Sequence, residues 1–490
     1  MDFDRLISQL KKRFPNHIQV FQIENHKAQE LLILPKNQKV ELTDDTRRIQ
    51  SNSFYFSTHF AKPYLSDAIS KKPFAMFLSR KELRFLTEHG GYQGIVVIGK
   101  RIPDFYLGHA SSIYYEDLSQ SLNLIAITGT NGKTTTSFMI YHLWKKKNLP
   151  CAVVGTLGIF YWDGQKEMYE PSGFTTPRAY ELQKILKYFL DKNIKNIVIE
   201  ASSEALALRR LEGLHIQKAV FTTFGRDHLN FHMTLSAYFF AKLHLFFLTL
   251  RTSKQRMFIV VPQDQTKILF QKFEEKTKCS IHYLKKEELN SPFVKNQPFP
   301  VKFNQWNALC AFYATQNLYN LNETPLEDFP NVPGRLQKIS VNAFVDAIID
   351  YAHTPDALEV VLKELRNFYA NIIVVFGCGG NRDREKRPQM GSIAERLSDL
   401  VILTDDNPRD EDPEFIRQEI KAGIKDFHKV LEIGDRKNAI ITALKIATEM
   451  NQKPVCVLVA GKGHEEYQII KKQKLPFSDK QVVLEYLNSK

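Results

Sequence analysis

The residues with the clearest chemistry lie in the stretch LIAITGTNGKTTTS, residues 124–137. Its two glycines let backbone N–H groups close around phosphate oxygens, Lys133 supplies a positive charge, and the Thr134 hydroxyl is a ligand type for Mg²⁺. A full Walker A motif would need glycine at position 127, where this chain has isoleucine, so the loop has the shorter G-T-N-G-K-T form. The flanking runs predict a strand, a phosphate-binding loop and a helix; the alternative is a plain glycine-rich turn.

Two further strand ends carry candidate metal ligands. Glu200 ends the apolar run NIVIE, where a parallel-sheet nucleotide-binding fold places a metal-binding acid. Asp227, His228 and His232 lie in FGRDHLNFH after another apolar run, and His228 is a candidate second ligand. From residue types alone, a surface acid at position 200 and a structural histidine at position 228 stay open as alternatives.

An acidic turn, DDNPRDEDP at residues 405–413, follows the apolar run LVIL and contains a single arginine. Asn407–Pro408 makes the turn rigid, because proline fixes its own φ and restricts the residue before it. Arg409 can then form a two-pronged hydrogen bond with a carboxylate. The alternative is a polar turn before a helix that Asp412 caps and Pro413 begins, and both interpretations hold for the same backbone.

Three series of apolar runs must position these residues. Residues 1–118 mix short apolar runs with polar turns, as in a small α/β unit. From residue 124, and again from about residue 345, apolar strands alternate with helix-like stretches, which predicts parallel sheets covered by helices on both faces. NVPGRLQKI (331–339) marks a linker between the last two series. We therefore predict an α/β protein with three domains, at 1–118, 119–333 and 334–490.

The composition of the chain favours some classes of protein and argues against others. The chain of 490 residues is 43% hydrophobic and carries a formal net charge of +13, which favours anionic partners. Its lysines are spread along the chain rather than clustered with aromatic residues, which argues against a nucleic-acid-stimulated ATPase. The five cysteines form no C-x-x-C pair, which favours a reducing cytoplasm, and no secretory signal is expected at the start. The most apolar stretch, 238–250, is too short to span a bilayer and predicts a buried helix.

Several blocks occur in the order seen in one enzyme family. They are TGTNGKTTT, EASSEAL, RDHLNFH, IDYAHTPDAL (349–358), FGCGGNRDREKRPQMG (376–391), TDDNPR (404–409) and AGKGHEEYQ (460–468). They resemble the Mur ligases, most closely the branch that adds the third residue of the peptide, over about residues 122–480. Residues 1–118 match mainly at LTDDTRRI (42–49).

The resemblance implies a small α/β N-terminal domain that binds the uridine end of a substrate, a central parallel-sheet P-loop ATPase domain and a C-terminal Rossmann-like domain that receives an amino acid. The implied activity is ATP-dependent amide bond formation in peptidoglycan precursor synthesis, which serves cell wall biogenesis, cell shape and cell division. A carboxylate of UDP-MurNAc-L-Ala-D-Glu becomes an acyl phosphate, and the amine of the incoming amino acid then displaces phosphate. It further implies a cytoplasmic monomer that uses ATP and Mg²⁺ on small-molecule substrates, without nucleic acid or stable membrane insertion.

The resemblance also assigns roles around the nucleotide. ATP contacts fall on Gly129, Thr130, Asn131, Gly132, Lys133, Thr134, Thr135, Asn307, Arg335 and Asp350. Catalytic roles fall on Lys133, Lys242 and His228, and magnesium on Thr134, Glu200, His228 and Lys242. In this family the lysine at position 242 is carbamylated (N6-carboxylysine), which turns a cation into an anion that can hold Mg²⁺. From the residues alone, Lys242 would be a lysine that extends from an apolar helix to solvent.

Two more residue sets follow from the resemblance. UDP-MurNAc-dipeptide contacts fall on Asp44, Thr46, Thr175, Thr176, Ser202 and Arg210, and diaminopimelate contacts on Arg382, Asp406, Asn407, Pro408, Arg409, Gly461 and Glu465. In the family, D-N-P-R accompanies meso-diaminopimelate, whose distal carboxylate lysine lacks. Arg409 is expected to bind that carboxylate, and Glu465 the distal ammonium. An unpaired buried arginine would then reject lysine.

Four positions depart from the family pattern: Phe174, Glu204, Leu208 and Thr223 with the residue after it. All lie in the central domain, near the expected path of the muramoyl-peptide. The alternatives are a sister ligase that adds L-lysine or another residue, a folylpolyglutamate synthase, a nucleic-acid-stimulated P-loop ATPase and an inactive relative that only binds. The TDDNPR and GKGHE blocks argue against the first two.

Overall fold

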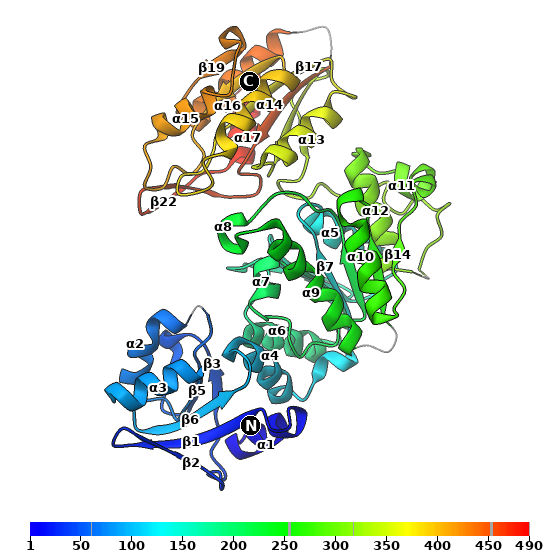
Figure 1. Ribbon diagram of the computed structural model, residues 1–490. Helices are drawn as coiled ribbons and strands as arrows, with labels where there is room; N and C mark the ends of the chain where they lie inside the picture. Colours follow the sequence, from blue (N-terminus) through cyan, green and yellow to red (C-terminus); the bar gives the residue numbers. More distant parts are fainter. Residues whose placement is uncertain (60, 253–255, 317, 451–453, 490) are drawn as a thin grey trace.

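The computed structural model describes residues 1–59, 61–252, 256–316, 318–450 and 454–489. Its strands form three large sheets and one two-stranded hairpin, and each large sheet comes from one continuous stretch of chain. Figure 1 shows the lobes built on these sheets in a row, from the N-terminal lobe (blue) through the central lobe (cyan to green) to the C-terminal lobe (yellow to red). The three sheets lie within the predicted ranges 1–118, 119–333 and 334–490, whose boundaries stay a prediction.

The N-terminal lobe has a mixed six-stranded sheet in the order β2-β1-β6-β5-β4-β3. β3 to β6 are parallel neighbours, and β1 runs antiparallel to β6. The strands are β1 (Ile18–Glu24), β2 (Lys27–Glu30), β3 (Glu41–Thr43), β4 (Ser53–Phe56), β5 (Ala75–Leu78) and β6 (Gly94–Gly99). The helices are α1 (Phe3–Arg13), α2 (Leu65–Ser70), α3 (Arg80–His89) and α4 (Pro103–Tyr114).

The central lobe has an eight-stranded sheet in the order β10-β9-β8-β11-β7-β12-β13-β14. The strands are β7 (Asn123–Thr128), β8 (Cys151–Gly155), β9 (Gly158–Trp162), β10 (Glu167–Glu170), β11 (Asn196–Glu200), β12 (Lys218–Phe221), β13 (Met257–Val260) and β14 (His282–Tyr283). The helices are α5 (Lys133–Lys146), α6 (Ala179–Asp191), α7 (Ser203–Ala207), α8 (Leu229–His232), α9 (Leu235–Thr252), α10 (Asp264–Thr277), α11 (Pro292–Lys295) and α12 (Lys302–Ala314).

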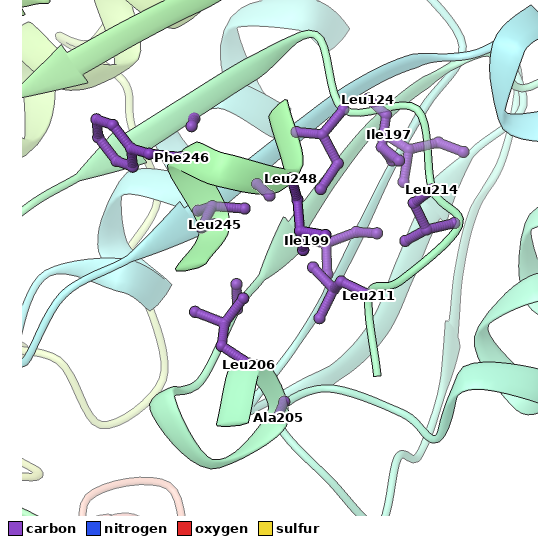
Figure 2. Packing of buried hydrophobic residues seen from close by; sticks show 14 of the residues in the cluster. Leu124, Ile197, Ile199, Ala205, Leu206, Leu211, Leu214, Leu245, Phe246 and Leu248 are labelled. Carbon is purple, nitrogen blue, oxygen red and sulfur yellow. The ribbon is translucent and has the colours of Figure 1, made fainter. Parts of the chain in front are cut away.

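Alternating residues of the central strands explain why helices cover both faces of this sheet. Leu124 and Ile197 point to the face covered by α6, α9 and α10, whereas Ile125 and Val198 point to the face covered by α5 and α12. Figure 2 shows Leu124, Ile197 and Ile199 packed among leucines that follow β11 and leucines of α9. Burial on both faces fits the continuous apolar runs of a parallel sheet.

The central sheet is parallel, as predicted, except for two strands at one edge. β9 is antiparallel to β8, and β10 is antiparallel to β9. The sequence does not indicate β10, because its four residues are mostly exposed and contain no apolar run. The six strands in the spatial order β8-β11-β7-β12-β13-β14 are parallel neighbours, as the sequence predicts for this sheet.

The C-terminal lobe has a six-stranded sheet in the order β15-β16-β20-β17-β18-β19, with only β15 antiparallel to its neighbour. The strands are β15 (Gln337–Ser340), β16 (Val345–Asp350), β17 (Asn371–Phe376), β18 (Leu400–Leu403), β19 (Val430–Glu432), β20 (Val455–Ala460), and the hairpin pair β21 (Tyr467–Ile470) and β22 (Gln473–Pro476). The helices are α13 (Pro355–Leu365), α14 (Lys386–Leu397), α15 (Pro413–Lys421), α16 (Arg436–Glu449) and α17 (Asp479–Asn488). Parallel strands bring the segments after Asp350, Phe376, Leu403 and Ala460 to one sheet edge.

No helix within the described residues is long and apolar enough to cross a membrane. The apolar stretch 238–250 lies within α9, and its inward side packs on the central sheet, as predicted for a buried helix.

A fully buried ion pair joins the last two helices of the chain. Arg436, the first residue of α16, donates to both carboxylate oxygens of Asp479, the first residue of α17, at 2.7 and 2.9 Å. We expect Asp479→Ala to lower the free energy of unfolding of this lobe by about 3 kcal/mol, because it leaves a buried guanidinium without its counter-charge. The measurement is urea unfolding followed by a signal from the C-terminal lobe.

The matched control is Glu485→Ala, which breaks an exposed ion pair between the same two helices, Lys437 Nζ to Glu485 Oε2 at 2.8 Å. Water and salt screen such a pair. The unfolding midpoint of the Glu485→Ala variant should therefore stay close to that of the wild type. Equal losses in the two variants would contradict the prediction.

Candidate active site

The phosphate loop lies between β7 and α5, as the sequence predicts. Gly129 and Gly132 have positive φ values of 147° and 89°, and a Cβ on Gly132 would lie 2.4 Å from Oδ1 of Asn307. Lys133 folds back over the loop and donates to the carbonyl oxygens of Gly129 and Thr130, both at 2.9 Å. The loop therefore combines the N-terminus of a helix with a lysine amine, and both attract phosphate.

A buried carboxylate and two hydroxyl groups lie beside this loop. Glu200, at the end of β11, is fully buried. It accepts hydrogen bonds from the Thr134 hydroxyl at 2.9 Å and from the backbone N–H and hydroxyl of Thr156 at 3.1 and 3.0 Å. A carboxylate surrounded by hydroxyl oxygens is a donor set that suits a hard cation such as Mg²⁺.

His228 stands apart from that carboxylate in its contacts. Its Nδ1 lies 3.2 Å from Glu204 Oε1 and its Nε2 lies 3.5 Å from Asp227 Oδ2. In the described part of the chain, no three His, Cys, Asp or Glu side chains are arranged to hold a metal ion. The expected magnesium ligands include a threonine and a carbamate, which are outside those four residue types.

Lys242 is buried in α9, with only 1% of its surface exposed. Its Nζ donates to the Gly129 carbonyl at 2.7 Å and lies 4.4 Å from the centroid of the Tyr238 ring. Burial holds the pKa of Lys242 well below its usual range, and the nearby charge of Lys133 adds to this effect. Burial therefore favours the neutral form of the amine, and the side chain does not extend to solvent as the alternative interpretation expects.

One cavity of about 580 Å³ joins most of the predicted residues. Its walls come from the phosphate loop, from the segments after β11 and β12, from α9 and α12, and from the start of the C-terminal lobe. The predicted site residues that line it are Thr130, Asn131, Gly132, Lys133, Thr134, Thr135, Thr175, Thr176, Ser202, Arg210, His228, Lys242, Asn307, Arg335 and Asp350.

Arg335 and Asp350 bring the linker between the two lobes to this cavity. The Arg335 guanidinium lies 4.6 Å from the centroid of the Tyr351 ring, and its Nη2 is 3.5 Å from the Thr134 hydroxyl. The carboxylate of Asp350 accepts from the backbone N–H groups of Leu336 and Ala352 at 2.7 and 2.8 Å. Burial raises the pKa of Asp350. These contacts hold the linker against the phosphate loop.

The residues predicted for the sugar-peptide fall into two places. Thr176 donates to the Glu200 carbonyl at 2.7 Å, and Arg210 donates to the Thr176 carbonyl at 2.7 Å, so both are fixed beside the buried acid. Asp44 instead lines a second cavity, of about 350 Å³, at the N-terminal lobe. Thr46 is buried and lines neither cavity; its carbonyl accepts from Lys71 at 3.0 Å.

The acidic turn places both signs of charge together. Arg409 adopts a left-handed φ of 53° and donates from Nη1 to the Gly380 carbonyl at 2.8 Å. Burial lowers its pKa, and the neighbouring charge of Arg382 adds to that effect. The carboxylate of Glu465 accepts from Asn407 at 2.9 Å and from Lys462 at 3.1 Å.

The alternative interpretation of the backbone, a helix that Asp412 caps and Pro413 begins, is confirmed. Pro413 begins α15, and the Asp412 carboxylate accepts from the Glu414 backbone N–H at 2.9 Å.

The seven residues predicted for diaminopimelate do not line the 580 Å³ cavity, and the linker connects the two places. A Cβ on Gly334 would lie 2.2 Å from the backbone N of His464. The segment that contains Glu465 therefore packs directly against the linker. The next linker residue, Arg335, reaches Thr134. The turn and the phosphate loop are therefore connected by a chain of contacts that passes through Glu465, His464, Gly334 and Arg335.

Comparison with known proteins identifies the relatives of this chain. Residues 127–315 match the family model of the Mur ligase middle domain, and residues 334–463 match that of the Mur ligase, glutamate ligase domain. A Clostridium botulinum protein named UDP-N-acetylmuramoyl-L-alanyl-D-glutamate--2,6-diaminopimelate ligase is 36% identical over 401 residues, covering 77% of this chain and 80% of the relative. The chain belongs to the Mur ligase family.

Two further Mur ligases extend the likeness over nearly the whole chain. A Clostridium tetani protein of the same name is 33% identical over 493 residues, covering 94% of this chain and 98% of the relative. A solved structure of an enzyme with that name matches with a TM-score of 0.58 at 30% identity, covering 92% of this chain and 95% of the other.

Each of the four residues that depart from the Mur ligase pattern either contacts other side chains or backbone or is buried. Glu204 pairs with His228, and this hydrogen bond lowers its pKa. Thr223 holds the phosphate loop, because its carbonyl accepts from the Thr130 N–H at 2.6 Å and its hydroxyl from the Asn131 N–H at 3.2 Å. Leu208 is buried, and Phe174 lies beside two arginines.

Sequence reasoning missed three residues that this Mur ligase places in or beside its site: Thr156, Arg178 and Lys462. Thr156 follows β8 directly, so its place at the carboxyl end of a parallel strand was a usable signal. Lys462 lies inside the GKGHE block. Nothing in the residues around Arg178 indicates its ion pair with Asp44, which is 134 positions away.

Proposed function

We propose that this Mur ligase joins meso-diaminopimelate to UDP-MurNAc-L-Ala-D-Glu and converts ATP to ADP and phosphate. The observation that carries the proposal is the rigid turn that sets Arg409 near Arg382, on the same sheet edge as Glu465. A zwitterion with a second charged end needs such a site, which offers cations for its carboxylates and an acid for an ammonium. The names of the relatives given above support the same choice.

The phosphate loop would bind ATP, with its backbone N–H groups and Lys133 around the β- and γ-phosphates. Thr134, Glu200, His228 and a carbamylated Lys242 would hold Mg²⁺, which offsets negative charge between the phosphates and the attacking carboxylate. Asn307 and Arg335 line the same cavity and would contact the rest of the nucleotide.

The reaction would proceed in two steps. A carboxylate oxygen of the nucleotide-sugar dipeptide attacks the γ-phosphorus, the bond to the bridging oxygen breaks, and ADP leaves. The free amine of the amino acid, which has lost its proton, then attacks the acyl carbon, and the tetrahedral intermediate expels phosphate. Thr175, Thr176, Ser202 and Arg210 would orient the first substrate, and such positioning supplies much of the rate in phosphoryl transfer.

The deciding experiment is ligation with purified protein, ATP and UDP-MurNAc-L-Ala-D-Glu, offered meso-diaminopimelate or L-lysine and followed by mass spectrometry of the product. We expect a tripeptide product with meso-diaminopimelate and little with L-lysine. If the protein ligates L-lysine in preference to meso-diaminopimelate, it is instead a sister ligase that adds L-lysine. ATP turnover that needs DNA or RNA would reject a ligase altogether.

We expect a carbamate on Lys242. Carbon dioxide reacts with a neutral amine, and burial favours this form by lowering the pKa of Lys242. ¹³C-NMR in ¹³C-bicarbonate should show a carbamate carbon that Lys242→Ala removes. Since the neutral amine is needed, the signal should fade as pH falls through the lowered pKa.

The control is Lys218→Ala. Burial also lowers the pKa of Lys218, but its amine donates to the Ala314 carbonyl at 2.6 Å and lines neither of the two cavities described above. A carbamate signal that survives Lys242→Ala, or is lost in Lys218→Ala, would contradict the assignment.

A further inference from the structure

Phe174 is an exposed aromatic residue in contact with two arginines. It lies in the segment between β10 and α6, 41% of its surface is exposed, and it lines the 580 Å³ cavity. The guanidinium carbon of Arg210 is 4.8 Å from the centroid of its ring, and that of Arg178 is 5.8 Å away. Both distances are within the range at which a cation is attracted to an aromatic face.

The two arginines belong to different cavities. Arg210 lines the 580 Å³ cavity and is anchored by its hydrogen bond to the Thr176 carbonyl. Arg178 lines the 350 Å³ cavity and is anchored by Asp44 of the N-terminal lobe at 3.1 Å. Because Phe174 contacts both, its ring lies where the two cavities approach each other.

Charge at this point favours an anionic ligand. Two guanidinium groups beside one ring repel each other, and burial together with the charge of Arg178 lowers the pKa of Arg210. Asp44, Glu204 and Glu181 offset part of that repulsion. An anion between the arginines would relieve the rest, and planar guanidinium groups suit carboxylate and phosphate oxygens.

We propose that Phe174 is a positioning residue for the acidic nucleotide-sugar peptide, holding Arg178 and Arg210 side by side so that both meet its anionic groups across the two cavities. This inference rests on the function proposed above and adds Phe174 and Arg178 to the residues that select the first substrate. The face of the aromatic ring attracts both cations and adds to the anchors that Thr176 and Asp44 provide.

The test is calorimetric binding of UDP-MurNAc-L-Ala-D-Glu in the absence of ATP, combined with steady-state kinetics. We expect Phe174→Ala and Phe174→Asn to weaken binding about tenfold, because two cation–π contacts are lost. The KM for the nucleotide-sugar peptide should rise by a similar factor. Turnover and the KM values for ATP and meso-diaminopimelate should change by less than about twofold. The lost contacts stabilise the bound nucleotide-sugar peptide equally in the ground state and the transition state, so their loss affects only the KM of that substrate.

Phe174→Tyr should restore most of the affinity, because it keeps the aromatic face. The control is Phe415→Ala in the C-terminal lobe. Phe415 is 45% exposed and has the guanidinium of Arg384 5.0 Å from its ring centroid, yet it lines neither of the two cavities. That variant should bind the nucleotide-sugar peptide as the wild type does.

Unchanged binding in Phe174→Asn would overturn the inference, as would equal losses in Phe174→Ala and Phe174→Tyr or a parallel loss for all three substrates. These outcomes are distinct from failure of the proposed function, in which the wild-type protein itself would not bind or ligate the nucleotide-sugar peptide.

Discussion

Lys133→Ala is expected to reduce ligation by about a thousandfold or more, since one charge that stabilises the transferring phosphoryl group is removed. In the structure, the Lys133 amine has only carbonyl oxygens of its own loop as hydrogen-bond partners within the described residues. Burial lowers its pKa, so an approaching phosphate would strongly favour its charged form. The measurement is ADP release in the presence of both other substrates.

The control is Lys146→Ala at the other end of α5. The Lys146 amine pairs with Asp328 at 2.7 Å on the surface, outside both cavities described above. We expect normal turnover in this variant and unchanged thermal unfolding in both. Retention of a tenth or more of the wild-type rate in a folded Lys133→Ala protein would contradict the assignment of the phosphate loop.

Arg409→Ala is expected to lower kcat/KM for meso-diaminopimelate by about a thousandfold, because a charged group of the substrate loses its counter-charge in a half-buried site. Arg409→Lys should be nearly as poor, since an ammonium is a point charge and cannot form the two-pronged hydrogen bond of a guanidinium. L-lysine has no distal carboxylate, so its weak use should change much less. The ratio of the two kcat/KM values measures the effect directly.

The matched control for Arg409 is Arg396→Ala. Arg396 is an exposed arginine of α14 in the same lobe, and it pairs with Glu359 at 3.0 Å. We expect no change in amino-acid preference from this substitution. If the preference in Arg409→Ala also stays that of the wild type, the turn does not select the amino acid and the proposed substrate loses its main support.

The sequence by itself was enough for features that depend on neighbouring residues. The phosphate loop between β7 and α5, the cap of α15 by Asp412 and the helix around Lys242 all follow from local patterns. Such patterns work because glycine and proline set φ, caps satisfy nearby N–H groups, and the period of apolar residues matches one kind of backbone. The family resemblance assigned roles to fifteen of the residues that line the 580 Å³ cavity.

Only the tertiary structure decided the surroundings of those residues. The hydrogen bond from Lys242 to Gly129 spans 113 positions, and the ion pair of Arg178 with Asp44 spans 134. The ring of Phe174 between two arginines and the antiparallel edge of the central sheet are likewise absent from any local pattern. Burial and the field of nearby charges set how a side chain behaves, and both come from segments that are distant along the chain and meet only in the folded protein.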